Sequence, residues 1–168
     1  MKRAHFIVGF NNWGKTHTIH ELMGHNPFSG TRYLVDRTYF IPDLRPQSFA
    51  VQSQSNDDID MKFLERVVAR LRATNAEHPD LIAALCPTRE RRNSMVDNLR
   101  NAVWDQFDHF HFYLLEYKWD LQAKLLLEEV ESHIAEIVQP FDCHRILGPN
   151  IHNRSLRVLR YFQQIYPL

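Results

Sequence analysis

The stretch Gly9-Phe10-Asn11-Asn12-Trp13-Gly14-Lys15-Thr16 matches the pattern G-x-x-x-x-G-K-T of a phosphate-binding P-loop over its whole length. The apolar run Ala4 to Val8 precedes it and is typical of a buried strand, and a helix-compatible segment, Thr16 to Met23, follows. Phosphate binding needs this order, because the backbone N–H groups of the loop and the start of the next helix together surround an anion. The stretch therefore predicts a strand, a phosphate-binding loop and a helix.

The side chains of this loop have separate expected roles. Gly9 and Gly14 allow backbone angles and close approaches that a Cβ would obstruct. Lys15 can reach the β- and γ-phosphates of a nucleotide, and the hydroxyl of Thr16 can ligate Mg²⁺. The bulk of Trp13 leaves two uses open, which are stacking on a base or substrate ring and covering the outer surface of the loop. The expected nucleotide-binding residues are Gly9, Asn11, Asn12, Trp13, Gly14, Lys15, Thr16 and His17.

Length and composition limit the class of protein. The 168 residues suit one compact domain, residues 1–168, with a full hydrophobic core. The 20 basic side chains balance the 20 acidic ones, which argues against nucleic acid as a partner. No apolar run approaches the roughly 20 residues that span a membrane, and the short N-terminal run leads straight into the loop, so neither a membrane partner nor a signal peptide is expected. Two cysteines, Cys86 and Cys143, make no disulfide framework, so a reduced, cytoplasmic protein is the expectation.

Apolar runs alternate with helical patterns along the rest of the chain. This alternation predicts an α/β three-layer sandwich in which helices cover both faces of a five-stranded, mainly parallel sheet, with the functional edge at the carboxyl ends of the strands. The segment 49–54 alternates apolar and polar residues, as a short strand or an extended flap would. The expected strands are 4–9, 31–35, 81–85, 109–115 and 143–147, and the expected helices are 16–23, 60–73, 89–103, 120–138 and 153–165.

On the loop motif and this order of elements, the chain resembles the small P-loop kinases, the group that contains adenylate and other nucleotide kinases, adenylylsulfate kinase, gluconate kinase and the zeta toxins. The resemblance covers most of the length, but its one specific motif is the stretch from Gly9 to Thr16. It implies ATP and Mg²⁺ as ligands. It also implies that the γ-phosphoryl group is transferred to a hydroxyl or phosphate of a small acceptor.

The resemblance also implies roles for residues outside the loop. Asp36 follows the second expected strand and matches a catalytic position that approaches the acceptor hydroxyl; as a plain turn residue it would instead pair with its neighbour, Arg37. The region 116–122 corresponds to the lid over the phosphates, and the loop 148–153 to the border of the base. Basic residues beside these positions are expected to bind an anionic substrate, namely Arg37, Arg89 and Arg92. The competing interpretation of the cluster 89–92 is a solvated group of arginines that Glu90 partly pairs.

Two departures from the kinase pattern favour an alternative function. The lid segment Tyr117-Lys118-Trp119 offers a lysine where family lids usually bring arginines. The third core strand ends in Cys86 instead of the acidic residue of a Walker B element. A nucleotide-binding switch or accessory protein that does not transfer phosphate is therefore the second hypothesis. The absence of an Asn-Lys-x-Asp stretch makes ATP the expected nucleotide over GTP.

The histidines and the remaining acidic residues give weaker signals. His109 and His111 lie two apart and share one face of an expected strand, and Cys143-His144 is another pair. Zinc needs three or four converging ligands, and the chain has neither a Cys-x-x-Cys nor a His-Glu-x-x-His arrangement, so the spacing by itself does not predict a zinc site. Asp57 and Asp58 are interpreted as caps of the helix that follows them.

Overall fold

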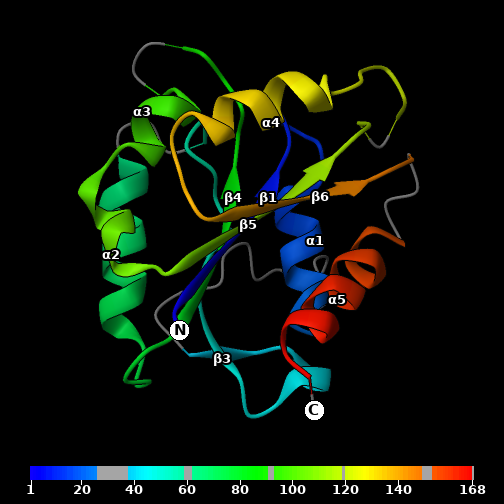
Figure 1. Cartoon of the computed structure of the whole chain (residues 1–168). Helices are drawn as coiled ribbons and strands as arrows, with labels where there is room; N and C mark the ends of the chain where they lie inside the picture. Colours follow the sequence, from blue (N-terminus) through cyan, green and yellow to red (C-terminus); the bar gives the residue numbers. More distant parts are fainter. Residues whose placement is uncertain (26–37, 59–61, 91–92, 119, 149–152, 168) are drawn as a thin grey trace.

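The apolar run ahead of the loop forms the centre of a six-stranded sheet in the computed structural model (Figure 1). The structure describes residues 1–25, 38–58, 62–90, 93–118, 120–148 and 153–167. The strands are β1 (Arg3–Val8), β2 (Tyr39–Phe40), β3 (Ser48–Gln52), β4 (Asp80–Leu85), β5 (His109–Leu115) and β6 (Phe141–Ile146). The α-helices are α1 (Lys15–Leu22), α2 (Phe63–Ala73), α3 (Met95–Leu99), α4 (Leu127–Ala135) and α5 (Arg154–Ile165), with 3-10 turns η1 (Pro42–Leu44) and η3 (Ala102–Gln106).

The strands lie in the order β2-β3-β4-β1-β5-β6. The pairs β3–β4, β4–β1, β1–β5 and β5–β6 are parallel, and β2 alone is antiparallel to its neighbour β3. The prediction of an α/β chain is confirmed, whereas the five-stranded sheet is not: the described residues already form six strands. Segment 49–54, left open between a strand and a flap, contributes β3, and β2 is unexpected; it forms because the proline-containing turn η1 folds Tyr39 back against Phe49.

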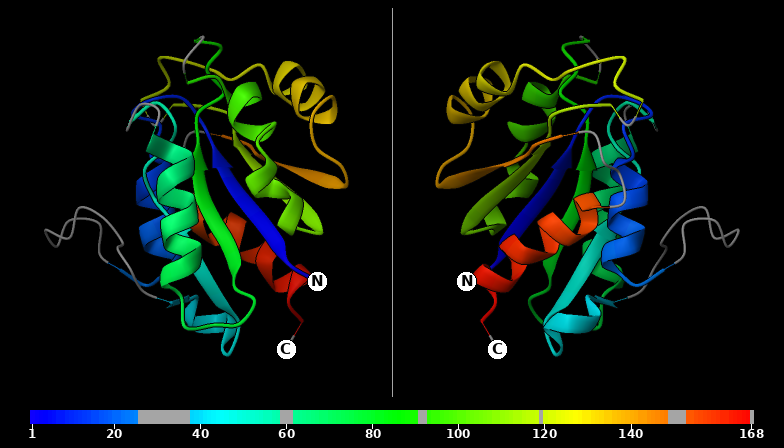
Figure 2. Two further views of the ribbon diagram at one scale, coloured as in Figure 1. Left: turned by 90° about the vertical axis from the view of Figure 1, so that its left-hand side faces the viewer. Right: turned by 90° about the vertical axis from the view of Figure 1, so that its right-hand side faces the viewer.

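Opposite faces of β1 contact different helices. The ring of Phe6 meets Trp104 of η3 on one face, and the ring of His5 stacks on Phe162 of α5 on the other. Because neighbouring side chains of a strand point to opposite faces, η3 and α5 cover opposite sides of the sheet. Helix α1 packs against α5, and the two lie side by side in Figure 1 and in the right-hand view of Figure 2.

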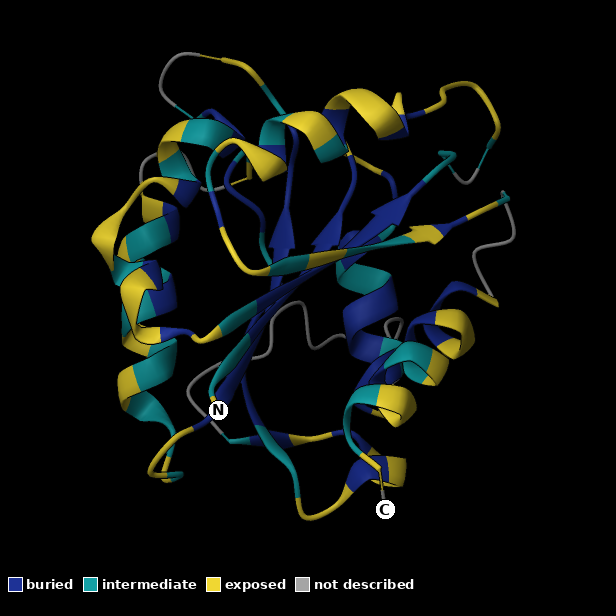
Figure 3. Cartoon of the chain, in the orientation of Figure 1, coloured by how far each residue is buried: buried dark blue, intermediate teal, exposed yellow. Residues whose placement is uncertain are grey.

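The core follows the central strands. Every residue of β4 is buried, as are all residues of β1 after Arg3, which accounts for the dark centre of Figure 3. A parallel strand that is covered on both faces reads as a continuous apolar run, and this is the pattern that predicted both strands. Within the described part of the chain, no helix has both the length and the apolar character needed to cross a membrane.

The longest predicted helix is shorter in the structure, because its first part forms a turn. Residues 120–138 were expected to form one helix, but α4 begins at Leu127. Residues 117 and 124 form an isolated antiparallel bridge instead, and Leu121 has a positive φ of 63°. Leu121 is 59% exposed, so it does not belong to the hydrophobic core.

The helix predicted for the arginine-rich segment is also shorter in the structure. A helix over 89–103 with Thr88 as its cap was expected, but α3 begins at Met95 and ends at Leu99. Ser94 is the cap, since its Oγ accepts a 3.0 Å hydrogen bond from the amide of Asp97. Arg89 therefore precedes the helix and lies outside its first turn.

Candidate functional site

The loop 9–14 leaves the carboxyl end of the central strand β1 and enters α1. The amide of Gly9 donates to the carbonyl of Leu85 at 3.1 Å, which fixes the loop's first residue to the neighbouring strand. Gly14 precedes the helix with a φ of 82°, a left-handed conformation that glycine adopts without a Cβ penalty. No side chain caps α1, and its first main-chain bond joins the amide of Thr18 to the carbonyl of Gly14. The N-terminal amides of α1 are thus available to an anion.

Trp13 takes neither of its two expected uses, because its ring lies inside the protein. The residue is 2% exposed, and its ring meets Phe10 edge-on at 5.6 Å. A Cβ added at Gly9 would lie 3.2 Å from the Cβ of Trp13, so the tryptophan explains why residue 9 is glycine. The indole anchors the loop from beneath and is not exposed to a nucleotide base.

Lys15 points back into its own loop. Its Nζ donates to the carbonyl of Phe10 at 2.7 Å, and the residue is 5% exposed. Burial lowers the pKa of Lys15, while the negative charges of Asp57 and Asp58 and the thiol of Cys86 act in the opposite direction. The amine is therefore held inside the loop, with acidic groups of another segment close by.

Thr16 connects the loop to the segment that follows β3. Its hydroxyl donates to the carbonyl of Ser53 at 2.8 Å. That segment, residues 53–58, therefore runs beside the start of α1. The hydroxyl of Thr16 and the nearby carboxylates are hard oxygen ligands, and this donor set fits Mg²⁺.

Asn56 fixes the segment 53–58 against the end of β4. The amide of Cys86 donates to its Oδ1 at 2.7 Å, and its Nδ2 donates to the carbonyl of Cys86 at 3.1 Å. The same Nδ2 donates to the carbonyl of Asn93 at 2.5 Å, so one fully buried side chain joins two loops at the carboxyl edge of the sheet. This connection positions Asp57 beside Cys86.

Asp57 supplies a carboxylate where β4 ends without one. Its side chain hydrogen-bonds to the thiol of Cys86. Its charge raises the pKa of Lys15 more than the charge of any other acid does. Burial, followed by the charge of Asp57, raises the pKa of Cys86 to about 12, so the thiol stays protonated and is no nucleophile at neutral pH. Sequence reasoning missed this role because it interpreted Asp57 as a helix cap and left 49–54 open between a short strand and a flap. The signal was the run Asn56-Asp57-Asp58 directly after an alternating segment.

The interpretation of Asp57 and Asp58 as helix caps is wrong. Helix α2 begins at Phe63 and no side chain caps it. Both carboxylates instead accept hydrogen bonds from Ser55. Asp57 accepts one from the serine hydroxyl. Asp58 accepts one from the hydroxyl and one from the amide, both at 3.1 Å. The two acids are thus held in a turn of their own beside the start of α1.

Arg154, at the start of α5, supports the loop from behind. Its Nη1 donates to the carbonyl of Trp13 at 2.6 Å, and its Nη2 donates to the carbonyl of Tyr117 in the lid region. The residue is 1% exposed, burial lowers its pKa, and the described part of the chain gives it no carboxylate partner. A buried cation that bonds only to carbonyls adds positive potential behind the loop. The sequence analysis did not single it out, because 141 positions separate it from Trp13.

Replacing Arg154 with Met should lower the free energy of unfolding by about 1–3 kcal/mol, because two carbonyls lose their donor. Arg157→Met is the matched control, since Arg157 lies one turn further along α5, is exposed and donates to the carbonyl of Leu147. We expect that variant to stay within about 0.5 kcal/mol of the wild type. Urea unfolding measures both, and equal stabilities for the two variants would contradict a supporting role for Arg154.

A cavity of about 400 Å³ lies next to the loop and reaches it through Phe10. Two basic residues, Arg89 and Lys124, contribute to its lining. Arg89 forms an ion pair with Glu129 of α4, and Lys124 pairs with Glu116 at 3.4 Å. The volume suits a small molecule, and an anionic ligand would compete with these two acids for the cations. The lining residues are Phe10, Pro87, Thr88, Arg89, Lys124, Leu125, Leu126, Glu129, Val130 and His133.

The lid region is a short, tied turn. Beyond the bridge between residues 117 and 124, the amide of Lys118 donates to the carbonyl of Ala123 at 3.0 Å, and its Nζ lies 3.0 Å from Asp120. Glu116 accepts a bond from the amide of Gly148 at 3.0 Å, which joins the lid to the expected base-side loop. The described part of this lid brings no arginine, apart from Arg154 at its root.

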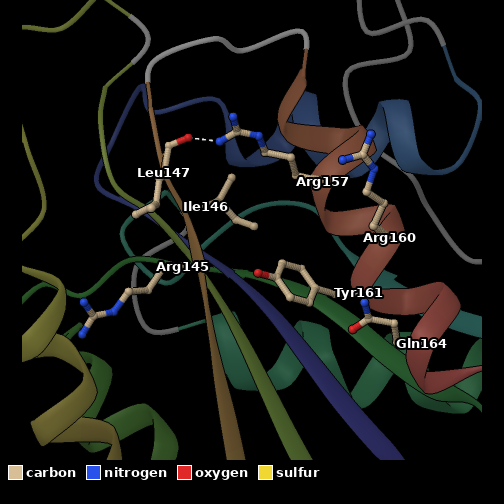
Figure 4. A pocket seen from close by; sticks show the side chains of 7 residues that line it. All are labelled: Arg145, Ile146, Leu147, Arg157, Arg160, Tyr161 and Gln164. Atoms are coloured by element: carbon tan, nitrogen blue, oxygen red, sulfur yellow. Dashed lines mark hydrogen bonds between the residues drawn. The ribbon is translucent and has the colours of Figure 1, made fainter.

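A second hollow, of about 440 Å³, lies between the end of β6 and α5 (Figure 4). Arg157 crosses it to the carbonyl of Leu147, and Arg160 and Tyr161 line its α5 side. Arg145 points away from it, toward α4, where it forms a two-bond pair with Glu131 at 2.8 and 2.7 Å. Because no residue of the loop 9–16 lines this hollow, it is separate from that loop.

Of the remaining predicted site residues, some are described by the structure and others are not. Asn11 and Asn12 are exposed on the loop, Asn12 with a φ of 59°, and His17 lies 3.1 Å from Glu21 within α1. Asp36, Arg37 and Arg92 lie outside the described residues, as does the expected strand 31–35. The structure thus brings together the loop, Thr16 and Lys15 with Asp57, and leaves the assigned role of Asp36 as a prediction.

The chain matches no protein-family model, and comparisons with curated proteins and with solved structures give no significant match.

Proposed function

We propose that the chain is a P-loop phosphotransferase that uses Mg²⁺ and ATP to phosphorylate a small hydroxyl- or phosphate-bearing acceptor. The observation that carries the proposal is that the Thr16 hydroxyl bonds to the segment 53–58, which brings the Asp57 carboxylate within electrostatic reach of the Lys15 amine at the carboxyl edge of the sheet. In an open α/β sheet this edge is where ligands bind. Phosphoryl transfer needs an amine and a hydroxyl on the loop and a carboxylate beside it.

The proposed reaction moves one phosphoryl group and one proton. The acceptor oxygen bonds to the γ-phosphorus, the bond from that phosphorus to the bridging oxygen breaks, and ADP leaves. Asp57 takes the proton of the acceptor hydroxyl, and Lys15 neutralises charge on the transferring group. Mg²⁺ held by Thr16 would neutralise further phosphate charge. Asp36 is the competing candidate for the proton-accepting role, on its position in the sequence.

The cavity beside Phe10 is the proposed acceptor site. Arg89 and Lys124 give it positive charge, and each already pairs with an acid that a stronger anion can replace. This lining favours an acceptor that carries a phosphate or carboxylate over a neutral one. The role expected for Arg89 is kept in the proposal, with Glu129 as the group that an acceptor displaces.

A nucleotide-binding switch remains the second candidate, and the lid supports it. The described lid contributes Lys118, which pairs with Asp120, and β4 ends in a protonated thiol. Such a site can hold a nucleotide without stabilising the transferring group. In that case Lys15→Ala should abolish binding of the partner, whereas Asp57→Asn should leave it unchanged.

Calorimetric titration with ATP and GTP, each with Mg²⁺ and with EDTA, is the first test. We expect binding of ATP that Mg²⁺ strengthens. Transfer of labelled γ-phosphate to a library of nucleosides, nucleotides and small hydroxyl metabolites is the second test. ATP binding without transfer to any acceptor would contradict the phosphotransferase and support the switch, and no binding of either nucleotide at millimolar concentration would contradict both.

A further inference from the structure

Three metal-ligating side chains converge on the outer part of the sheet, away from the phosphate-binding loop. His109 and His111 lie two apart on β5, and the register of β6 places Asp142 opposite His111. Their ligand atoms all lie within 4.8 Å of one another. His109 Nε2 is 2.9 Å from Asp142 Oδ2, and His111 Nδ1 is 3.6 Å from the same oxygen. Sequence spacing gave only the two histidines, and strand pairing supplies the carboxylate.

A further candidate ligand atom, on His144, lies beside His111. His144 Nε2 is 3.4 Å from His111 Nδ1, because His144 is two residues beyond Asp142 on the same face of β6. In tetrahedral zinc sites with bonds of 2.0–2.1 Å, neighbouring ligand atoms are about 3.3 Å apart. The separations of 3.4 and 3.6 Å around His111 are close to this value. Because the three ligand atoms spread over as much as 4.8 Å, binding of an ion would draw the side chains of His109 and His111 closer together.

One ligand of the cluster is open to solvent. Asp142 is exposed at its outer side, which gives an ion a path from solvent.

We propose that His109, His111 and Asp142 bind one divalent transition-metal ion of the zinc class, with His144 or water in the fourth position. Imidazole and carboxylate are ligands that zinc shares with Co²⁺ and Fe²⁺. The ligands come from the early part of β5 and β6, whereas the loop 9–16 follows the carboxyl end of β1, so the site is structural and independent of nucleotide. The ion would fasten the edge strand β6 to β5.

One feature sets the expected affinity. The Nε2 atom of His111 is buried and has no hydrogen-bond partner among the described residues. Metal-bound histidines usually donate their second ring nitrogen to an acceptor, and loss of that partner weakens binding by 10- to 100-fold. We therefore expect binding in the micromolar range, weaker than in a fully supported zinc site.

The test uses the full chain, freed of metal with a chelator and without nucleotide. Calorimetry with ZnCl₂ should give one ion per chain, and zinc should raise the melting temperature. Titration with CoCl₂ should give the visible absorption bands of four-coordinate Co²⁺, which report the ligand set without any substitution. Asp142→Asn and His109→Gln, both at solvent-accessible positions, should each weaken zinc binding at least 10-fold, whereas His78→Gln, exposed and remote, should not.

Two results would overturn the site. One is the absence of both stoichiometric zinc binding and four-coordinate cobalt bands in the wild-type chain. The other is zinc binding of equal affinity in Asp142→Asn, His109→Gln and the wild type, which would place the ion elsewhere. Circular dichroism of each variant checks that its fold is intact.

Discussion

Replacing Lys15 with Ala should weaken ATP binding by about 30- to 1,000-fold or more. Truncating one partner of a buried, hydrogen-bonded charge pair typically costs 2–5 kcal/mol, and each 1.4 kcal/mol is a factor of ten in affinity. In the proposed complex the Nζ atom leaves the carbonyl of Phe10 and contacts the β- and γ-phosphates. Calorimetry with ATP and Mg²⁺ measures the loss.

The stability of Lys15→Ala separates lost binding from lost structure. Without nucleotide the amine makes one bond to a main-chain carbonyl, and burial already disfavours its charge. We therefore expect the variant to unfold within about 1.5 kcal/mol of the wild type. Lys62→Ala, at an exposed position before α2, is the control and should bind ATP normally. Normal ATP affinity in Lys15→Ala would rule out the loop as the phosphate site.

Replacing Asp57 with Asn should reduce phosphoryl transfer by about 10²- to 10⁴-fold while the affinity for ATP changes only a few-fold. General-base contributions are of this size, and the amide keeps the shape of the carboxylate but cannot take a proton. The bond to Ser55 can be kept, so the turn that holds the residue stays intact. Single-turnover transfer and calorimetry separate the two effects.

Two further variants identify the carboxylate that acts. Asp58→Asn changes the neighbouring acid, whose described bonds go to Ser55, and should leave transfer within a few-fold. Asp36→Asn tests the assignment made from sequence order. A large loss of transfer in Asp36→Asn with normal transfer in Asp57→Asn would assign catalysis to Asp36 and contradict the role proposed here for Asp57.

The proposed metal site and the proposed phosphate site lie on different strands of the same sheet. The loop follows the central strand β1, where neighbours on both sides hold the backbone, and the histidine and aspartate cluster lies on β5 and the edge strand β6. An edge strand has hydrogen-bonding partners on one side only. A metal ion that joins β6 to β5 would therefore stabilise the least supported side of the sheet. Zinc binding and ATP binding can therefore be measured independently.

Local patterns were enough to predict several elements. The apolar runs that became β1, β4 and β5, and the stripe of α5, were predicted within one or two residues, because a doubly covered strand and a one-sided helix leave regular signatures. The prediction failed where neighbours in space decide. Helix α4 is shorter than its apolar spacing suggests, because the bridge between residues 117 and 124 competes for the chain.

By itself, the sequence determined the stretch from Gly9 to Thr16. A glycine at position 14 that permits a φ of 82°, a lysine next to it and an apolar run before the loop are all fixed by covalent neighbours. Only the tertiary structure decided what surrounds that loop. Asp57 acts on Lys15, and Arg154 reaches Trp13 from 141 positions away, because strand order and helix packing bring distant segments together. Backbone conformation is governed by local sterics, whereas the choice of charged neighbours depends on how the elements bury their apolar faces.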